Sequence, residues 1–314
     1  MNSLKNDRDR KKTRLVRRII HAAFAVVILA MAALTVNGAP GDLFASINGG
    51  PGNGAGFIHR YTRDGAESLF ASGLSRPRGL AFDSAGNLFV ATNFCDDATW
   101  CHPTILKITS GGTQNTFAII PDSFFAEGLA IDHSDNLFVM AIAWSNTVSI
   151  IYKITPEGAR TSFGFVPEHG FDLAFDSAGN LFAADVTGQS IYKFTPDGTR
   201  SIFVGPEAFT NPETAPIGLA FDHFGNLFVS TQVFPYNRDG ILKFTPRGVK
   251  STFVSGLPNP RDLIFDSAGK LFAAENPPSA CGDILKFARV PIVFASDVGV
   301  PQENGGPQYL AIQP

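Results

Sequence analysis

The sequence has few charged residues and none of the short motifs that mark the common catalytic sites. Charged residues make up 17% of the chain and hydrophobic residues 44%, so it can bury a core and is not disordered. It contains no H-E-x-x-H, G-x-S-x-G or phosphate-loop pattern. No segment after residue 38 has a convincing helical period. These absences exclude the usual zinc-protease, nucleophile-elbow and nucleotide-binding signatures and favour an all-β fold.

The first 38 residues differ in composition from the rest. Residues 1–18 carry eight Lys or Arg and two Asp, and residues 19–36 are apolar apart from His21 and Thr35. A basic segment, an apolar run and small residues predict a secretory signal peptide over residues 1–38. The alternative is an uncleaved membrane anchor, because the apolar run reaches the lower limit of a membrane span. Either way we expect an exported protein, periplasmic or extracellular.

The chain after residue 38 is acidic. It holds 17 basic and 26 acidic residues, a formal net charge of −9. Such a charge argues against nucleic acid or anionic lipid as a partner. We therefore expect that nucleic acid is not a partner and that the protein contacts a membrane only through an uncleaved N-terminal segment. We also expect a monomer.

Cysteine is scarce, with three in 314 residues. Cys95 and Cys101 lie close together in CDDATWC, and an exported chain permits a disulfide between them. Cys281 would be left over. A metal site would need a second Cys or His pair at ligand spacing, which His102 alone does not supply.

One eight-residue phrase recurs five times. FDSAGNLF stands at residues 82–89 and returns, unchanged or nearly so, at 131–138, 175–182, 221–228 and 265–272. The intervals between its Asp residues are 49, 44, 46 and 44. A nearly fixed period of this size is typical of solenoids, propellers and arrays.

Each period contains four short runs of β-forming residues. In the first period they are GLAFD, NLFVA, ILKIT and a run around Phe117. Turn residues separate them, so they read as hairpin-connected strands. The body begins at GDLFAS, a second-type strand, and ends at QYLAIQ, a first-type strand. Residues 41–314 are therefore predicted to form an all-β, six-bladed β-propeller of four-stranded antiparallel blades, closed by pairing the N- and C-terminal strands in one blade.

The repeated phrase has two interpretations. Asp83 and Asn87 suit a turn, in which Asp accepts backbone hydrogen bonds and Gly86 takes a positive φ. A calcium loop would need more oxygen ligands than one Asp and one Asn per blade. We favour the turn. These turns are nearly uniform and lie on one face of the propeller, whereas the loops of the opposite face differ in every blade, which is where recognition usually lies.

The residue before each GLAFD-type run should point into the mouth of the axial tunnel on the divergent face. These residues are Arg78, Glu127, Phe171, Ile217, Arg261 and Gln308. Two Arg and one Glu at a concave site suit a carboxylate or phosphate ligand. The alternative is that Arg78 and Arg261 pair with Glu127, Asp262 or solvent.

Other residues of the divergent face complete the candidate set. Trp100 and Trp144 suit stacking on a sugar or partner, or a lid over the ring centre. Asn93 and Asp185, at the ends of second strands, form an oxygen-rich metal cluster with Glu127 in one interpretation and polar strand caps in the other.

The phrases GLAFDSAGNLFVA and IYKFTPDGTRSIFV resemble the NHL-type six-bladed propellers over residues 41–314. They are also similar to the senescence-marker-protein/gluconolactonase and streptogramin-lyase-like relatives. The gluconolactonase-like resemblance implies one divalent cation, calcium or zinc, with Asn93, Glu127 and Asp185 as its ligands. The lyase resemblance implies a catalytic His and Glu pair, for which His169 with Glu127 or Glu275 are the candidates. The E-G-P motif of the lactonases would fall near residue 41, where this chain reads APGDLFAS.

Two functions follow as hypotheses. The first is a propeller that binds a small-molecule or protein ligand on its divergent face, through Arg78, Glu127, Arg261 and Gln308. The second is a metal-dependent lactonase, another hydrolase or a lyase. A propeller fold by itself does not choose between them, because it carries unrelated activities.

Overall fold

The structure is a computed structural model. It describes residues 38–49, 54–95, 101–121, 123–143, 148–209, 214–233, 239–277, 281–288, 291–299 and 306–314. Residues 39–314 form one compact unit. Residues 1–37 lie outside the described part, so the signal peptide or anchor remains a prediction. Across the described ranges, no helix has the length and apolar character needed to cross a membrane.

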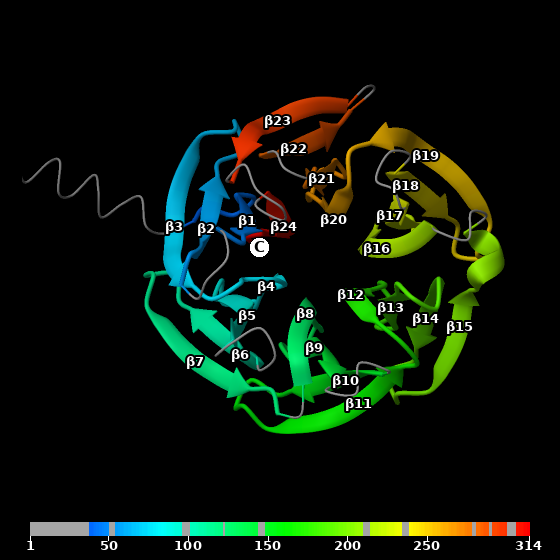
Figure 1. Ribbon diagram of the computed structural model, residues 1–314, viewed down its shortest axis with the longest axis horizontal. Helices are drawn as coiled ribbons and strands as arrows, with labels where there is room; N and C mark the ends of the chain where they lie inside the picture. Colours follow the sequence, from blue (N-terminus) through cyan, green and yellow to red (C-terminus); the bar gives the residue numbers. More distant parts are fainter. Residues whose placement is uncertain are drawn as a thin grey trace, which may run out of the picture. The chain divides into compact units, whose positions relative to one another are not determined.

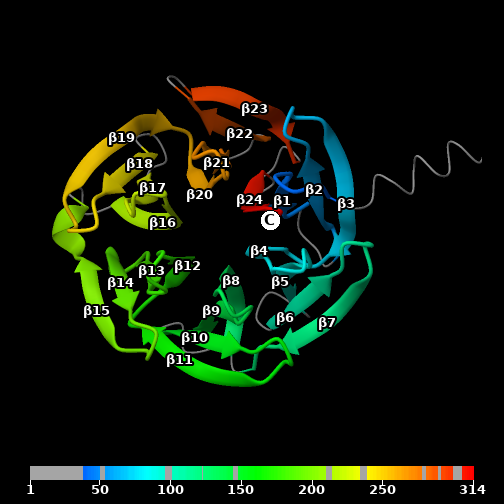
Figure 2. The ribbon, with the colours of Figure 1, turned by 180° about the vertical axis from the view of Figure 1, so that it is seen from behind.

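Six four-stranded antiparallel sheets surround a central axis (Figures 1 and 2). Numbered along the chain, blade 1 is β24 (Pro307–Ile312), β1 (Leu43–Ile47), β2 (Gly56–Tyr61) and β3 (Glu67–Leu74). Blade 2 is β4 (Leu80–Phe82), β5 (Leu88–Cys95), β6 (Cys101–Ile108) and β7 (Gln114–Ile119). Blade 3 is β8 (Ser123–Ile131), β9 (Leu137–Ala143), β10 (Ser149–Ile154) and β11 (Arg160–Val166).

The remaining blades follow in the same order. Blade 4 is β12 (Gly170–Phe175), β13 (Leu181–Asp185), β14 (Ser190–Phe194) and β15 (Arg200–Val204). The short 3-10 helix η1 (Pro206–Ala208) leads to blade 5, which is β16 (Thr214–Phe221), β17 (Leu227–Val233), β18 (Asp239–Phe244) and β19 (Lys250–Leu257). Blade 6 is β20 (Pro260–Phe265), β21 (Leu271–Glu275), β22 (Gly282–Phe287) and β23 (Pro291–Val298).

Blade 1 closes the ring as the sequence predicted. Its inner strand β24 comes from the C-terminal end and pairs with β1, with Leu43 opposite Ile312 and Phe44 opposite Ala311. The backbone N–H of Gln313 donates to the backbone carbonyl of Asp42 at 3.0 Å. In blade 2 the backbone N–H of Asp83 donates to the carbonyl of Asn87 in the same way. Two distant segments thus rebuild, without a covalent hairpin, the turn that the other blades form within one segment.

The repeated phrase is a hairpin turn. Asp83 Oδ1 accepts the backbone N–H of Ala85 at 3.1 Å and of Asn87 at 2.8 Å, and Asn87 Nδ2 donates to Asp83 Oδ2 at 2.8 Å. Gly86 has φ +77°, and Asp135, its replacement in blade 3, has φ +58°. All the oxygen atoms of the Asp therefore serve the turn, as the sequence predicted.

The abundant phenylalanines pack between blades. Phe138 of β9 stands edge-on to Phe163 of its own blade, at 4.9 Å between ring centroids, and to Phe175 of the next blade, at 5.0 Å. The rings of Phe44, Phe182 and Phe228 make the same pair of contacts in blades 1, 4 and 5. One aromatic triad thus recurs around the ring, and each triad joins two blades.

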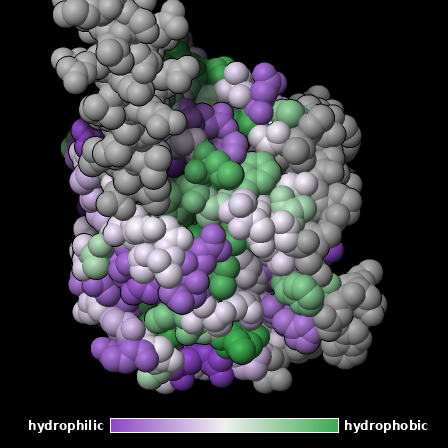
Figure 3. Space-filling view, turned by 90° about the vertical axis from the view of Figure 1, so that its left-hand side faces the viewer, coloured by the Kyte–Doolittle hydropathy of each residue, from purple (hydrophilic) through white to green (hydrophobic). Residues whose placement is uncertain are grey.

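The outer strands cover little beyond their own blade. They leave single apolar side chains exposed, such as Leu69 of β3 and Ile119 of β7. The side of the molecule that contains β3 accordingly mixes hydrophilic and hydrophobic surface (Figure 3). Scattered apolar residues of this kind are ordinary for a folded surface.

Candidate ligand-binding site at the ring axis

The inner strands bring the predicted axial residues together. Arg78 Nη1 donates to Gln308 Oε1 at 2.9 Å, and Arg261 Nη2 lies 3.5 Å from the same oxygen. Arg78 Nε lies 3.7 Å from Glu127 Oε2. Arg78 lies two residues before β4, while the other three lie on β8, β20 and β24, which surround the axis (Figure 1). Residues up to 230 positions apart in sequence therefore form one cluster.

Aromatic rings form one wall of this cluster. The guanidinium carbon of Arg261 lies 4.7 Å from the centroid of the Phe171 ring. Tyr309 stacks on Phe171 with centroids 5.8 Å apart, and its hydroxyl lies 3.3 Å from Glu127 Oε2. Burial, and next the charge of Glu127, raise the pKa of Tyr309, so this hydroxyl stays protonated and donates.

Tyr309 is a site residue that we did not predict from the sequence. It stands where the repeat has Gly in Gly79 and Gly128, because the last run reads QYLAIQ instead of RGLAFD. The same position is Gly in blades 2, 3 and 5 and Asp in blades 4 and 6, so a large aromatic side chain there was the signal that marked it.

The cluster carries more positive than negative charge. It contains two guanidinium groups, while Glu127 is its one carboxylate. The side chain of Arg78 is 15% exposed and that of Glu127 is 6% exposed, while Arg261 and Gln308 are buried. Arg78 is therefore the most exposed of these four side chains. Since the surroundings have a low dielectric constant, each charge acts more strongly here than at an open surface.

Two buried carboxyl groups, those of Asp172 and Asp262, directly follow the cluster residues Phe171 and Arg261 in the inner strands β12 and β20. Asp172 Oδ2 accepts the backbone N–H of Leu219 at 2.8 Å, and Asp262 Oδ2 accepts that of Leu310 at 2.7 Å. With Tyr309 they line an axial cavity of about 240 Å³. Each carboxyl holds the inner strand of the next blade. Burial raises the pKa of Asp262 to about 7, and burial followed by the charge of Asp262 raises that of Asp172.

The candidate metal ligands are spread over three blades. The side-chain amide of Asn93 makes two hydrogen bonds to Ala126 of the next blade. Its Nδ2 donates to the Ala126 carbonyl at 3.0 Å, and its Oδ1 accepts the Ala126 N–H at 2.8 Å. Asp185 accepts the N–H of Gly188, and within the described residues its buried Oδ2 has no hydrogen-bond partner. Burial raises the pKa of Asp185. Within the described residues, no group of three or more His, Cys, Asp and Glu is arranged to hold a metal ion.

The candidate catalytic residues are also separate. His169 is half-buried before β12, and its carbonyl accepts the N–H of Val186 at 2.8 Å. Glu275 is buried at the end of β21, and its Oε1 has no hydrogen-bond partner among the described residues. Burial raises the pKa of Glu275 to about 7. Through the described part of the chain, no hydrogen bond or ion pair joins His169, Glu275 and Glu127 to one another. Trp100 and Trp144 lie outside the described residues.

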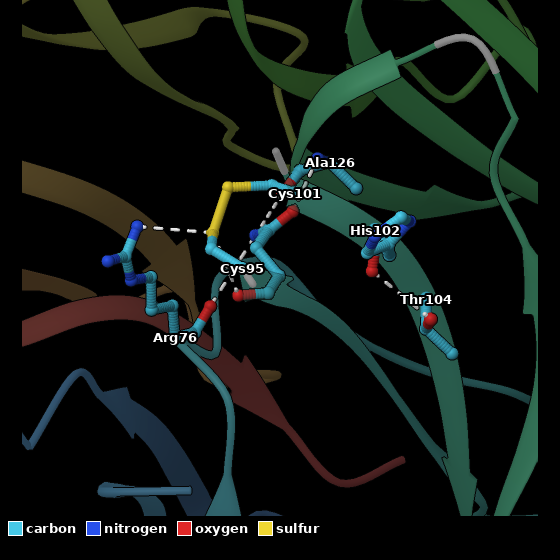
Figure 4. The surroundings of a disulfide bond; sticks show 7 residues. Arg76, Cys95, Cys101, His102, Thr104 and Ala126 are labelled. Atoms are coloured by element: carbon cyan, nitrogen blue, oxygen red, sulfur yellow. Dashed lines mark hydrogen bonds between the residues drawn. A yellow bond between two sulfur atoms is a disulfide. The ribbon is translucent and has the colours of Figure 1, made fainter. Parts of the chain in front are cut away.

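A disulfide joins Cys95 and Cys101 on the divergent face. It links the end of β5 to the start of β6, where the two residues are paired. Arg76 Nη1 lies 3.2 Å from Cys95 Sγ, and His102 accepts a bond from the Thr104 hydroxyl (Figure 4). Cys281 carries a free thiol. The disulfide holds the two strands together where they leave the blade towards the divergent loop.

Known structures share this fold. No model of a known protein family matches the sequence, and no curated protein matches it either. Virginiamycin B lyase from Staphylococcus aureus is 16% identical, with 82% of this chain and 84% of that chain covered and a TM-score of 0.56. A putative gluconolactonase is 16% identical over 78% of this chain and 80% of that chain, with a TM-score of 0.50. The PQQ-bound aldose sugar dehydrogenase from Streptomyces coelicolor is 17% identical over 74% and 86%, with a TM-score of 0.56.

These similarities define the class of protein as a six-bladed β-propeller with the fold of the lyase and gluconolactonase-like proteins. At such low identity they establish the architecture, and a shared propeller does not carry a shared activity. The predicted six-bladed fold is confirmed, and so is its predicted structural similarity to the lyase and gluconolactonase-like propellers.

Proposed function

We propose that this protein is exported and binds a small ligand bearing a carboxylate, at the axial cluster of Arg78, Glu127, Phe171, Arg261 and Gln308. One observation carries the proposal. The guanidinium groups of two arginines converge on a single neutral amide oxygen, Gln308 Oε1, at 2.9 and 3.5 Å. An anionic oxygen at this position would gain more from the two groups than an amide oxygen does.

The cluster also suits the remainder of such a ligand. Arginine presents its donors as a planar fork that matches a carboxylate. The Phe171 ring beneath Arg261 and the Tyr309 ring stacked on it offer a flat apolar wall to an aromatic or sugar-like body. Glu127 positions the Arg78 side chain, but its negative charge repels an anionic ligand. Its charge should therefore lower the affinity that the two arginines provide.

Two substitutions that each remove one charge test this proposal. We expect Arg78→Gln to weaken the binding of benzoate at least about tenfold, because a charge-assisted contact is lost. Glu127→Gln should strengthen benzoate binding, because it removes the competing carboxylate and keeps the side-chain volume. Isothermal titration calorimetry on the purified protein, with equal thermal stability of the variants as the control, measures both. Equal benzoate affinity in the wild type and both variants, or no saturable binding to any of them, would contradict it.

The second candidate is a metal-dependent lactonase or a lyase. It is supported by the fold shared with virginiamycin B lyase and the putative gluconolactonase, and by the position of Glu127 at the axis. In this case Glu127, with Asn93 or Asp185, would hold a divalent cation that polarises the substrate carbonyl.

Metal content and turnover decide on the second candidate. If this candidate is correct, the purified chain should carry about one calcium, zinc or manganese ion, Glu127→Gln should lose that ion, and the protein should hydrolyse gluconolactone until a chelator is added. Elemental analysis and a lactone assay provide the measurement. Metal-free protein that stays inactive when these cations are added would remove this candidate.

A further inference from the structure

A second pocket lies at the seam where blade 6 meets blade 1. Its volume is about 230 Å³, and Arg63 and Thr62 line it from blade 1, while Lys270, Lys286, Phe272 and Phe294 line it from blade 6. It is distant from the axial cluster along β20, since Arg261 is near the start of that strand and the Asp266–Lys270 turn follows its end. The pocket is therefore not part of the site described above.

The split turn of blade 1 borders this pocket. At the junction of blades 2 and 3, the neighbouring turns bond to each other: Ser84 of blade 2 donates through its N–H and its hydroxyl to Asp135 of blade 3, at 2.8 and 2.6 Å. At the seam, the turn of blade 1 consists of two segments held by the bond from Gly41 N–H to the Gln313 carbonyl. Gly41 and Ile312, one from each segment, line the pocket.

Lys270 breaks the repeat at this one turn. In blades 2 to 5 the corresponding Asn donates its side-chain amide to the Asp of the turn, through Asn87, Asn136, Asn180 and Asn226. Lys270 has no side-chain amide to form that clamp, and within the described residues the Asp266 carboxylate accepts hydrogen bonds from the backbone N–H groups of Ala268 and Lys270 alone. A sequence that gives up a stabilising interaction at one copy of a repeat is expected to do so at a functional position.

Lys286 differs from three of its four counterparts. Lys107, Lys153 and Lys243 reach the turn Asp of their own blades at 3.1, 3.7 and 3.7 Å. In the described residues of blade 6, no ion pair joins Lys286 to Asp266, and Lys193 of blade 4 likewise has none to its turn Asp. The ammonium group of Lys286 lies 4.9 Å from the Phe272 ring centroid, a contact that its counterparts also make with their own Phe, and 5.3 Å from that of Phe294. Three cationic side chains thus border the pocket against the one carboxylate of Asp266.

We infer that this seam pocket is a second binding site, for a small phosphate monoester with an apolar or aromatic body. Lys270, Lys286 and Arg63 approach from two blades and suit the several oxygens and double charge of a phosphate. Phe272 and Phe294 supply an apolar surface for the body of the ligand. A ligand held by both blades would also stabilise the closed ring, because it binds only where the seam is formed.

The repeat itself provides the test. Phenyl phosphate is titrated by calorimetry into the wild type, Lys270→Asn, Asn180→Lys and Arg78→Gln. Lys270→Asn restores the turn of the other blades and should weaken binding at least about tenfold, whereas Asn180→Lys and Arg78→Gln should bind as the wild type does. Inorganic phosphate should bind more weakly than phenyl phosphate, and the affinity should fall with added salt.

Three outcomes would overturn the inference. These are the absence of saturable binding of phenyl phosphate up to about 10 mM, equal affinity in Lys270→Asn, or loss of binding in Arg78→Gln instead. The last outcome would assign the ligand to the axial site. Because benzoate probes that site separately, failure of one proposal leaves the other measurable. Thermal unfolding of Lys270→Asn serves as the folding control, and its restored Asn clamp should keep it at least as stable as the wild type.

Discussion

Removal of residues 307–314 should abolish cooperative thermal unfolding of the protein. This deletion takes away β24, whose Tyr309, Leu310 and Ala311 are buried, and uncovers the edge of β1. It also removes the Leu310 N–H from Asp262 and Gln308 from both arginines. Blades of a propeller find cover only on their neighbours, so an open ring exposes apolar surface on both sides of the gap. The expected loss equals the whole stability of a domain, about 5–15 kcal/mol.

Calorimetry and circular dichroism measure this loss. Deletion of the exposed Pro314 alone is the matched control and should leave the melting temperature unchanged. Addition of a synthetic peptide of residues 306–314 to the shortened chain should restore a cooperative transition, because the peptide supplies the missing strand in trans. A shortened chain that unfolds like the wild type would show that the pairing of β1 with β24 does not hold the ring together.

Phe138→Ala should lower the free energy of unfolding by about 3–5 kcal/mol, the cost of a large cavity at a buried aromatic position. Phe138 is 2% exposed. Its ring contacts Phe163 and Phe175, and Lys153 Nζ lies 5.4 Å from its centroid. The substitution therefore removes contacts within blade 3 and between blades 3 and 4 together. Urea denaturation gives the free energy of unfolding.

Two further variants show whether the effect belongs to the triad. Phe138→Leu keeps much of the volume and should cost less than about 1.5 kcal/mol. Phe224→Ala changes an aromatic side chain that is 73% exposed and should stay within about 0.5 kcal/mol of the wild type. A similar loss in Phe138→Ala and Phe224→Ala would argue against interblade packing as the source of stability.

The fold could be predicted from the sequence because the blade phrase has a local cause. Asp83, Gly86 and Asn87 form a turn through bonds that span at most four residues, so the pattern is visible in any copy. Its repetition counted five blades, and the unmatched QYLAIQ supplied the sixth. The position before each GLAFD-type run then placed Arg78, Glu127, Arg261 and Gln308 at the axis, where the structure brings their side chains together.

The pairing of Arg78 with Glu127 was one of the alternatives that the sequence left open, but the part that Gln308 plays could not be predicted in the same way. The convergence of Arg78 and Arg261 on Gln308 depends on the radius of the ring and on side-chain directions, which no local pattern encodes. The role of Asn93, which ties blade 2 to Ala126 of blade 3, depends likewise on the packing of two blades.

The sequence by itself determined the number of blades, their turns and the strand that closes them, because each of these is specified by residues close together in the chain. Only the tertiary structure decided which charges meet and where space remains. Lys270 shows the difference. In the sequence it is one departure from FDSAGNLF, but the closed ring places it beside Lys286 and Arg63 at the seam pocket. Charges at distant positions combine into a site only after the blades have packed, since that packing sets the distances between them.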